Sequence, residues 1–128
     1  MPNPRVVRPA AASSVVDLRL ARALRALQAE PARSWTMKEL AKVAGASRAS
    51  LVRLFHGTTG TSPKRWLTLY RLERAAELLA GSDQTVAQVA TSVGYASEFA
   101  FSRAFKRQFG VAPARYREQG SLGLRCAA

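Results

Sequence analysis

Apolar residues recur at helical spacing through most of the 128-residue chain. Between Leu20 and Leu27 they follow the i, i+3, i+4, i+7 rule, while arginines occupy the other side of the helical wheel. This pattern predicts an amphipathic helix over about residues 17–30. No stretch alternates between apolar and polar residues in the way that predicts a strand. The expected fold class is therefore all-α.

Short capping signals then mark a pair of helices. Thr36 and Glu39 have the spacing of a capping box, which starts a helix, and Gly45 suits the left-handed end of that helix. Ser47 can cap a second helix over about residues 48–57. Two helices around a tight glycine turn are typical of a helix-turn-helix unit.

A longer helix is predicted over residues 63–80. Ser62 provides a cap, Pro63 is a favourable first helical residue, and Gly81 provides a stop signal. At about 1.5 Å per residue this helix would be a rod of roughly 27 Å.

The helix-turn-helix pattern then recurs. Thr85 and Gln88 form a second capping box, Gly94 supplies the turn, a helix follows over about residues 97–109, and Pro113 begins a short last helix. The matched pairs at an offset of 50 are Ser47 with Ser97, Leu51 with Phe101, Arg53 with Arg103, Phe55 with Phe105, Gly60 with Gly110, Pro63 with Pro113, Arg65 with Arg115, and Trp66 with Tyr116. The first helices of the two units match at an offset of 49, so the second turn has one extra residue. Such a repeat predicts one supersecondary unit used twice, with the long helix between the copies.

The helical wheel predicts which side chains of the two repeated helices face away from the core. At about 100° per residue, Leu51 and Phe101 face inward together with Phe55 and Phe105. The outward residues are Ala49, Val52, Arg53 and His56 in the first helix, and Phe99, Ser102, Arg103 and Lys106 in the second. Successive major grooves on one face of B-DNA lie ~34 Å apart. The long helix with its turns is expected to hold the two recognition helices near that separation.

The charge of the chain indicates a polyanionic partner. Lys and Arg number 20 against 8 Asp and Glu, which gives a net charge of +12, and like charges on a small chain oppose compaction. Nucleic acid is the first candidate and an anionic membrane surface the second. No apolar run approaches the ~18–20 residues of a membrane span, and the N-terminus lacks an apolar signal region. Nucleic acid is therefore the favoured partner, with no membrane contact expected, and the two helix-turn-helix units favour double-stranded DNA.

The length of the chain predicts a single domain between two tails. Residues 1–14 are expected to be a disordered tail or the stub of a linker, residues 15–119 the DNA-binding domain, and residues 120–128 a flexible C-terminal tail. Arg5 and Arg8 could form a minor-groove arm, although a plain flexible tail is favoured.

Signals for catalysis are missing from the sequence. His56 is the only histidine and Cys126 the only cysteine, so no multi-histidine or cysteine-cluster metal site can be built, nor an internal disulfide. No glycine-rich phosphate-binding motif occurs. We expect a chain that is not an enzyme, needs no cofactor and works in the cytoplasm. A sequence-neutral, basic nucleic-acid-binding protein is the main alternative to a sequence-specific regulator.

The second unit carries a recognisable signature. The glycine turn at Gly94, the aromatic pair Phe101 and Phe105, the Gly-x-x-Pro from Gly110 and the terminal Tyr-Arg at residues 116–117 together resemble the AraC/XylS transcription regulators. The resemblance extends over residues 17–118, and it implies a seven-helix domain of two helix-turn-helix lobes joined by a long linker helix. It further implies that the third and sixth helices enter adjacent major grooves. RNA polymerase and an upstream sensor or dimerisation domain are then candidate partners.

The resemblance also assigns roles to the outward residues. The base-reading positions are Arg48, Ala49, Val52, Arg53, Glu98, Phe99, Ser102 and Arg103. Phosphate contacts are expected from polar and basic residues near the ends of the two outward-facing helices and at the starts of the helices that follow them. These residues are Ser47, Lys64, Arg65, Ser97, Lys106, Arg107 and Arg115.

Several of these residues have an alternative interpretation. Ala49 and Val52 can offer only apolar contact, for instance to a thymine methyl group. Phe99 could meet a thymine methyl group or sugar, or could pack against the tail or another domain. Glu98 could accept from cytosine, or simply complement the helix dipole. His56 could contact phosphate or be an uninvolved surface residue. Arginines 19, 22 and 25 are expected to form a solvated helix face.

Overall fold

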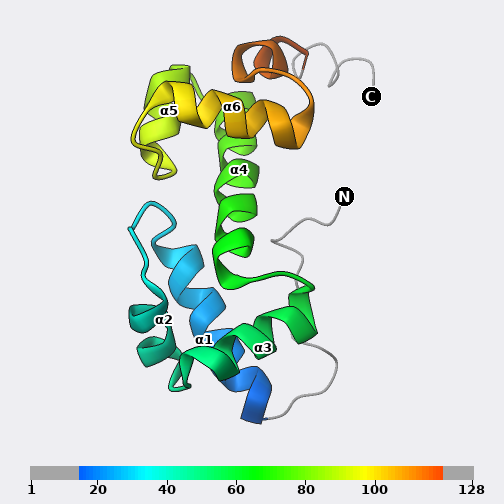
Figure 1. The fold of residues 1–128 in the computed structure, drawn as a ribbon. Coiled ribbons are helices and arrows are strands. Elements are labelled where there is room, and N and C mark those ends of the chain that lie inside the picture. Colours follow the sequence, from blue (N-terminus) through cyan, green and yellow to red (C-terminus); the bar gives the residue numbers. More distant parts are fainter. Residues whose placement is uncertain (1–14, 120–128) are drawn as a thin grey trace. The chain divides into compact units, whose positions relative to one another are not determined.

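The structure, a computed structural model, describes residues 15–119 as a succession of helices (Figure 1). The helices are α1 (Val15–Ala29), α2 (Met37–Ala44), α3 (Arg48–Thr59), α4 (Pro63–Gly81), α5 (Val86–Ser92) and α6 (Glu98–Phe109), followed by a seventh helical segment over residues 113–119. No strand occurs within these residues, which confirms the all-α prediction. The predicted tails, with Arg5, Arg8 and Cys126, lie outside the described residues.

The predicted single domain consists of two compact units, the first ending at Tyr70 and the second beginning at Arg71. Each unit contains one helix-turn-helix pair and has its own hydrophobic cluster. There are two clusters because helix α4 contributes to both. Its first part supplies Trp66 and Leu67 to one cluster, and its later part supplies Leu72 and Leu79 to the other.

In the first unit, α2 and α3 are joined by a short turn and pack on α1 (Figure 1). Leu24, Leu40, Phe55 and Trp66 are all buried in this unit, one from each of its four helices. The Trp66 ring meets the Phe55 ring edge-on, with centroids 6.4 Å apart, and stacks on the Tyr70 ring at 5.2 Å. The apolar stripe of α1 is therefore buried against the helix-turn-helix pair, as its spacing predicted.

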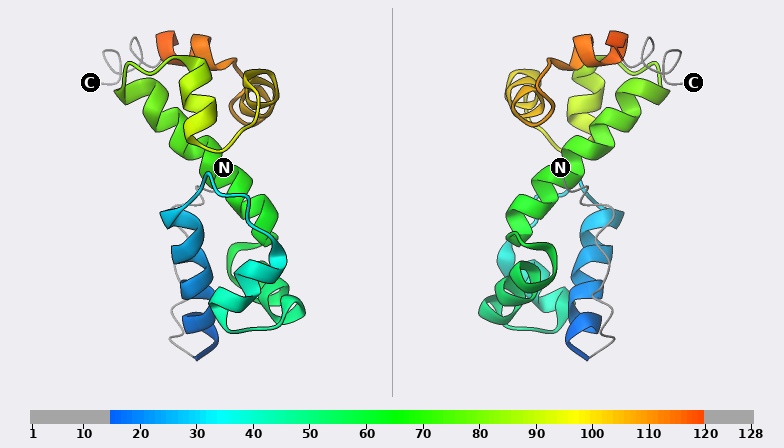
Figure 2. Two further views of the ribbon diagram at one scale, coloured as in Figure 1. Left: turned by 90° about the vertical axis from the view of Figure 1, so that its left-hand side faces the viewer. Right: turned by 90° about the vertical axis from the view of Figure 1, so that its right-hand side faces the viewer.

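In the second unit, α5, α6 and the segment over residues 113–119 gather around the C-terminal half of α4 (Figure 2). The core is more aromatic than that of the first unit. The Phe105 ring lies within 5.6 Å of the Phe101 ring, 4.5 Å of the Phe109 ring and 5.3 Å of the Tyr116 ring. Tyr116 is half-buried, so it contributes to this core without being fully enclosed.

Both predicted capping boxes are present. The Thr36 hydroxyl accepts from the backbone N–H of Glu39 at 3.1 Å, and the Glu39 carboxylate accepts from the backbone N–H of Thr36 at 3.1 Å. Thr85 and Gln88 form the same reciprocal pair in the second unit. Gly45 ends α2 with a φ of 74°, a left-handed conformation that glycine adopts without steric cost.

The predicted ends of two helices were inaccurate. Helix α3 continues past Gly57 to Thr59 and is capped by Gly60, whose φ is 76°. Gly57 is exposed and remains helical, because a glycine weakens a helix without necessarily ending it. Gly81 is the last residue of α4 rather than a stop beyond it. None of the described helices is both long enough and apolar enough to span a membrane.

The extra residue of the second turn has a packing role. Tyr95 is half-buried, and its ring lies 5.5 Å from that of Phe101. Burial raises the pKa of the Tyr95 phenol, an effect opposed by the nearby Arg71 guanidinium. The inserted position thus adds an aromatic ring to the second core, where the first turn has only Ala46.

Candidate nucleic-acid interface

Helices α3 and α6 present the same pattern of burial along their length. Leu51 and Phe55 are fully buried on α3, as are Phe101 and Phe105 on α6. Position by position, the buried, half-buried and exposed residues of 51–60 match those of 101–110. The repeat seen in the sequence is therefore a repeat of orientation, with one face of each helix in the core and the other exposed.

The caps of the two helices are also equivalent. The Ser47 hydroxyl accepts from the backbone N–H of Ser50 at 3.1 Å, and the Ser97 hydroxyl accepts from that of Ala100 at 3.0 Å. Gly60 and Gly110 end the helices in the left-handed conformation. Because these caps fix both ends, the sequence between them determines the face that each helix presents.

The outward face of α3 carries a short series of linked side-chain hydrogen bonds. Arg48, Ala49 and Arg53 are exposed, and Val52 is half-buried. The Nη2 of Arg53 donates to the Ser50 hydroxyl oxygen at 3.2 Å, which also accepts from the Ser47 hydroxyl at 3.0 Å. The Arg53 guanidinium is therefore held along its own helix.

The outward face of α6 differs in chemistry. Glu98, Phe99 and Arg103 are exposed, and Ser102 is half-buried. The Cζ of Arg103 lies 5.7 Å from the centroid of the Phe99 ring, within the range of a cation–π contact. Glu98 stands in the first turn of α6, where a carboxylate also complements the helix dipole.

All the residues predicted to contact phosphate are exposed. They are Ser47, Lys64, Arg65, Ser97, Lys106, Arg107 and Arg115. Lys64 and Arg65 lie in the first turn of α4, and the backbone N–H of Arg65 already donates to the Ser62 hydroxyl at 3.1 Å. The backbone N–H of Arg65 is therefore already bonded, and the group that Arg65 exposes to solvent is its side chain.

The chain is similar to a known family and to known transcription regulators. A family model described as a helix-turn-helix domain matches residues 40–119. An AraC-like transcription regulator of Streptomyces lividans is 43% identical over 110 residues, which are 86% of this chain and 36% of that protein. The transcriptional activator RclR of Escherichia coli is 42% identical over 107 residues, 84% of this chain and 38% of that protein.

A solved structure gives the same result. The DNA-binding domain of AdpA, a global transcriptional factor solved in complex with a target DNA, superposes with a TM-score of 0.74 and 34% identity, over 79% of this chain and 91% of that one. The chain belongs to the AraC family of helix-turn-helix transcription regulators. It spans about a third of the length of the two regulators from Streptomyces lividans and Escherichia coli.

One side chain that ties together the second unit of this AraC-type domain was not predicted. The Arg117 guanidinium donates from Nε to the carbonyl oxygen of Leu79 at 2.8 Å and from Nη2 to the carbonyl oxygens of Ser82, at 3.2 Å, and Gln84. It thereby ties the segment over residues 113–119 to the end of α4 and the loop that follows. Its partners lie 33 to 38 residues away along the chain, so no local pattern announces them.

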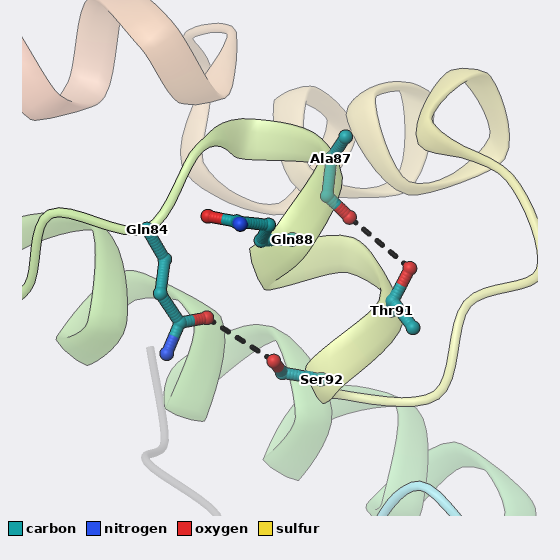
Figure 3. Close-up of a pocket in the computed structure, with 5 residues that line it drawn as sticks. All are labelled: Gln84, Ala87, Gln88, Thr91 and Ser92. Carbon is teal, nitrogen blue, oxygen red and sulfur yellow. Dashed lines mark hydrogen bonds between the residues drawn. The ribbon is translucent and has the colours of Figure 1, made fainter.

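A shallow depression of the AraC-type domain lies between the loop after α4 and helix α5 (Figure 3). Its lining residues are Gln84, Ala87, Gln88, Thr91 and Ser92. The Ser92 hydroxyl donates to the Gln84 side-chain carbonyl at 3.1 Å, and the Thr91 hydroxyl donates to the Ala87 carbonyl at 3.2 Å. The lining carries no charge, so it lacks the ionic component that Lys and Arg bring to phosphate contacts.

Proposed function

We propose that this chain is the DNA-binding part of a transcription regulator, which recognises a two-part site by placing α3 and α6 in successive major grooves of double-stranded DNA. The observation that carries the proposal is the shared burial pattern of α3 and α6, which leaves an equivalent arginine exposed on each helix. The likeness to the DNA-binding domain of AdpA, solved with a target DNA, supports it.

Base reading is assigned to four exposed or half-buried residues in the first two turns of each helix. These residues are Arg48, Ala49, Val52 and Arg53 on α3, and Glu98, Phe99, Ser102 and Arg103 on α6. An arginine can donate two hydrogen bonds to the O6 and N7 atoms of guanine, which is the commonest specific contact in the major groove. Arg53 and Arg103 are the main candidates for that contact.

Phosphate contacts would supply most of the affinity. The exposed hydroxyl and basic groups at the ends of the helices suit this role, and about 6–10 such contacts would make binding steeply dependent on salt. In this proposal the chain acts by binding and catalyses no reaction. Its location is the cytoplasm, at the nucleoid, and RNA polymerase and a sensor or dimerisation domain are its proposed protein partners.

Selection of bound duplexes from a random pool tests this function. We expect enrichment of two short half-sites about one helical turn, or ~10 base pairs, apart. Wild-type protein titrated against the selected site and against a scrambled duplex at the same salt concentration provides the control. Equal affinity for both would favour the alternative, a sequence-neutral basic binding protein, which the net charge of +12 also suits.

A further inference from the structure

Phe99 is unusual among the exposed residues of the described chain. With 73% of its surface exposed it is the most open of the large apolar side chains, compared with 52% for Leu18 and 44% for Val43. It stands in the first turn of α6, on the face turned away from the core residue Phe101. The equivalent residue on α3 is Ala49, so this ring distinguishes the second unit from the first.

The Phe99 ring lies beside the outward arginine of α6. Phe99 and Arg103 are one helical turn apart, and the guanidinium carbon is 5.7 Å from the ring centroid. A cation–π contact is an electrostatic attraction between the guanidinium and the ring, and it leaves the guanidinium N–H groups able to donate hydrogen bonds. Within residues 15–119 Arg103 forms no hydrogen bond or ion pair, whereas Arg53 on α3 donates to Ser50 at 3.2 Å.

We propose that Phe99 and Arg103 act as one composite reader of a thymine and a guanine in adjacent base pairs. The inference rests on the proposed function and specifies the DNA sequence that α6 takes. The C5-methyl group of thymine is the apolar feature of the major groove, and guanine presents the O6 and N7 acceptors that match the arginine fork. The guanidinium carbon and the ring centroid are 5.7 Å apart, between one and two base-pair steps of about 3.4 Å, so the two side chains are close enough to reach neighbouring pairs.

The two contacts are coupled in this arrangement. The ring that meets the methyl group also attracts the guanidinium, which reduces the conformational freedom that Arg103 must lose on binding. Removing Phe99 therefore weakens guanine recognition as well as thymine recognition. On α3 the position equivalent to Phe99 is Ala49, so Arg53 has no aromatic ring one turn before it on its own helix.

The test uses the full chain and the duplex obtained by selection. Base analogues in the DNA each remove one chemical group. Replacing thymine by uracil removes only the methyl group, and replacing guanine by 7-deazaguanine removes only N7. For wild-type protein we expect a loss of about four-fold for the uracil duplex and of ~5- to 100-fold for the 7-deazaguanine duplex.

Two variants then test the coupling. Phe99→Ala should bind the thymine and uracil duplexes equally and should lose part of its sensitivity to 7-deazaguanine. Arg103→Ala should be insensitive to 7-deazaguanine. Arg53→Ala is the matched control, because it removes the equivalent arginine of α3 and should keep both sensitivities at the α6 half-site. Unchanged helical circular dichroism and melting temperature would show that each variant is folded.

The outcomes separate this inference from the proposed function. A selection that enriches no duplex overturns both. An enriched site that lacks an adjacent thymine and guanine, or that tolerates both base analogues, overturns the composite reader alone. The same holds if Phe99→Ala binds every duplex like wild type, because the ring would then serve a protein contact instead.

Discussion

Arg53 and Arg103 occupy equivalent positions but have different neighbours. Arg53 donates to Ser50, while Arg103 lies over the Phe99 ring. Hydrogen bonding to a side chain of the same helix uses one of the five donors of a guanidinium, and the remaining donors can still form the fork that suits guanine. If both arginines read bases as proposed, they do so from different starting conformations.

Replacement of Arg53 by lysine distinguishes a base contact from a phosphate contact. Lysine keeps the positive charge but has no planar fork. If Arg53 reads guanine, Arg53→Lys should lose ~1–3 kcal/mol of binding free energy on the selected site and keep its affinity for a random duplex. Competition titrations with the two duplexes measure this difference. Retained preference for the selected site would assign Arg53 to phosphate.

Alanine substitutions of Arg115 and Arg117 should have different effects on stability and DNA binding, although the two residues are only two positions apart. Arg117 donates to three backbone carbonyls, so Arg117→Ala should lower the free energy of unfolding of the second unit by about 1–3 kcal/mol. Arg115 is exposed, so Arg115→Ala should change that free energy by less than about 0.5 kcal/mol and weaken DNA binding instead. Urea unfolding followed by circular dichroism, paired with DNA titration, checks both. Equal stability losses in the two variants would contradict the assignment.

At the scale of single elements, the two capping boxes differ in one chemical respect. The third residue is Glu39 in the first box and Gln88 in the second. Only the first box can therefore titrate. The backbone N–H of Thr36, followed by hydrogen bonding from Arg33, holds the pKa of the Glu39 carboxyl below its usual value.

The loss of folding stability at low pH should depend in part on Glu39. Because its folded-state pKa is lowered, its contribution is present above the ordinary carboxyl pKa and is lost as the pH falls through the lowered value. Glu39→Gln keeps a capping-box residue but removes the charge, so its stability relative to wild type should improve as the solution is acidified. Thermal unfolding at neutral and acidic pH measures the trend. A stability difference that stays constant with pH would contradict it.

Local signals in the sequence predicted the elements well, for physical reasons. Capping boxes and left-handed glycines act within four residues, so Thr36 and Gly45 could be interpreted directly. The end of α3 was misjudged because Gly57 and Gly60 are equally plausible stops until the φ of Gly60, 76°, is known. The exposed faces of α3 and α6 followed from the position of the core phenylalanines.

Other features of the candidate site depend on tertiary structure or on rotamers. The bond from Arg117 to the Gln84 carbonyl joins segments that the sequence gives no reason to connect. The choice of Arg53 between Ser50 and solvent, and of Arg103 for the Phe99 ring, depends on side-chain torsions that sequence spacing allows but does not fix.

At the scale of the whole molecule, the positive charge is unevenly divided. Residues 15–70 contain ten Lys and Arg against three Asp and Glu, whereas residues 71–119 contain seven against five. The first unit therefore carries a net charge of +7 and the second +2 over these residues. Since counterion release follows the number of phosphates neutralised, the first unit should contribute more of the salt dependence.

A charge-removing variant of the first unit tests this. Changing Lys64 and Arg65 to glutamine should lower the slope of log affinity against log salt concentration by ~2, with equal losses on selected and random duplexes. Arg25→Gln, on the face of α1 expected to be solvated, is the control and should leave the slope unchanged. A loss confined to the selected duplex would assign the pair to base recognition.

The separate cores have a spectroscopic consequence. Both tryptophans, Trp35 and Trp66, belong to the cluster of the first unit, and the second unit has only tyrosines and phenylalanines. Emission excited where tyrosine does not absorb therefore reports on one half of the protein, while far-ultraviolet dichroism sums over both. Melting curves from the two signals will coincide if the halves unfold together. They will diverge if one half persists after the other has melted. Tryptophan fluorescence then identifies which half unfolds first.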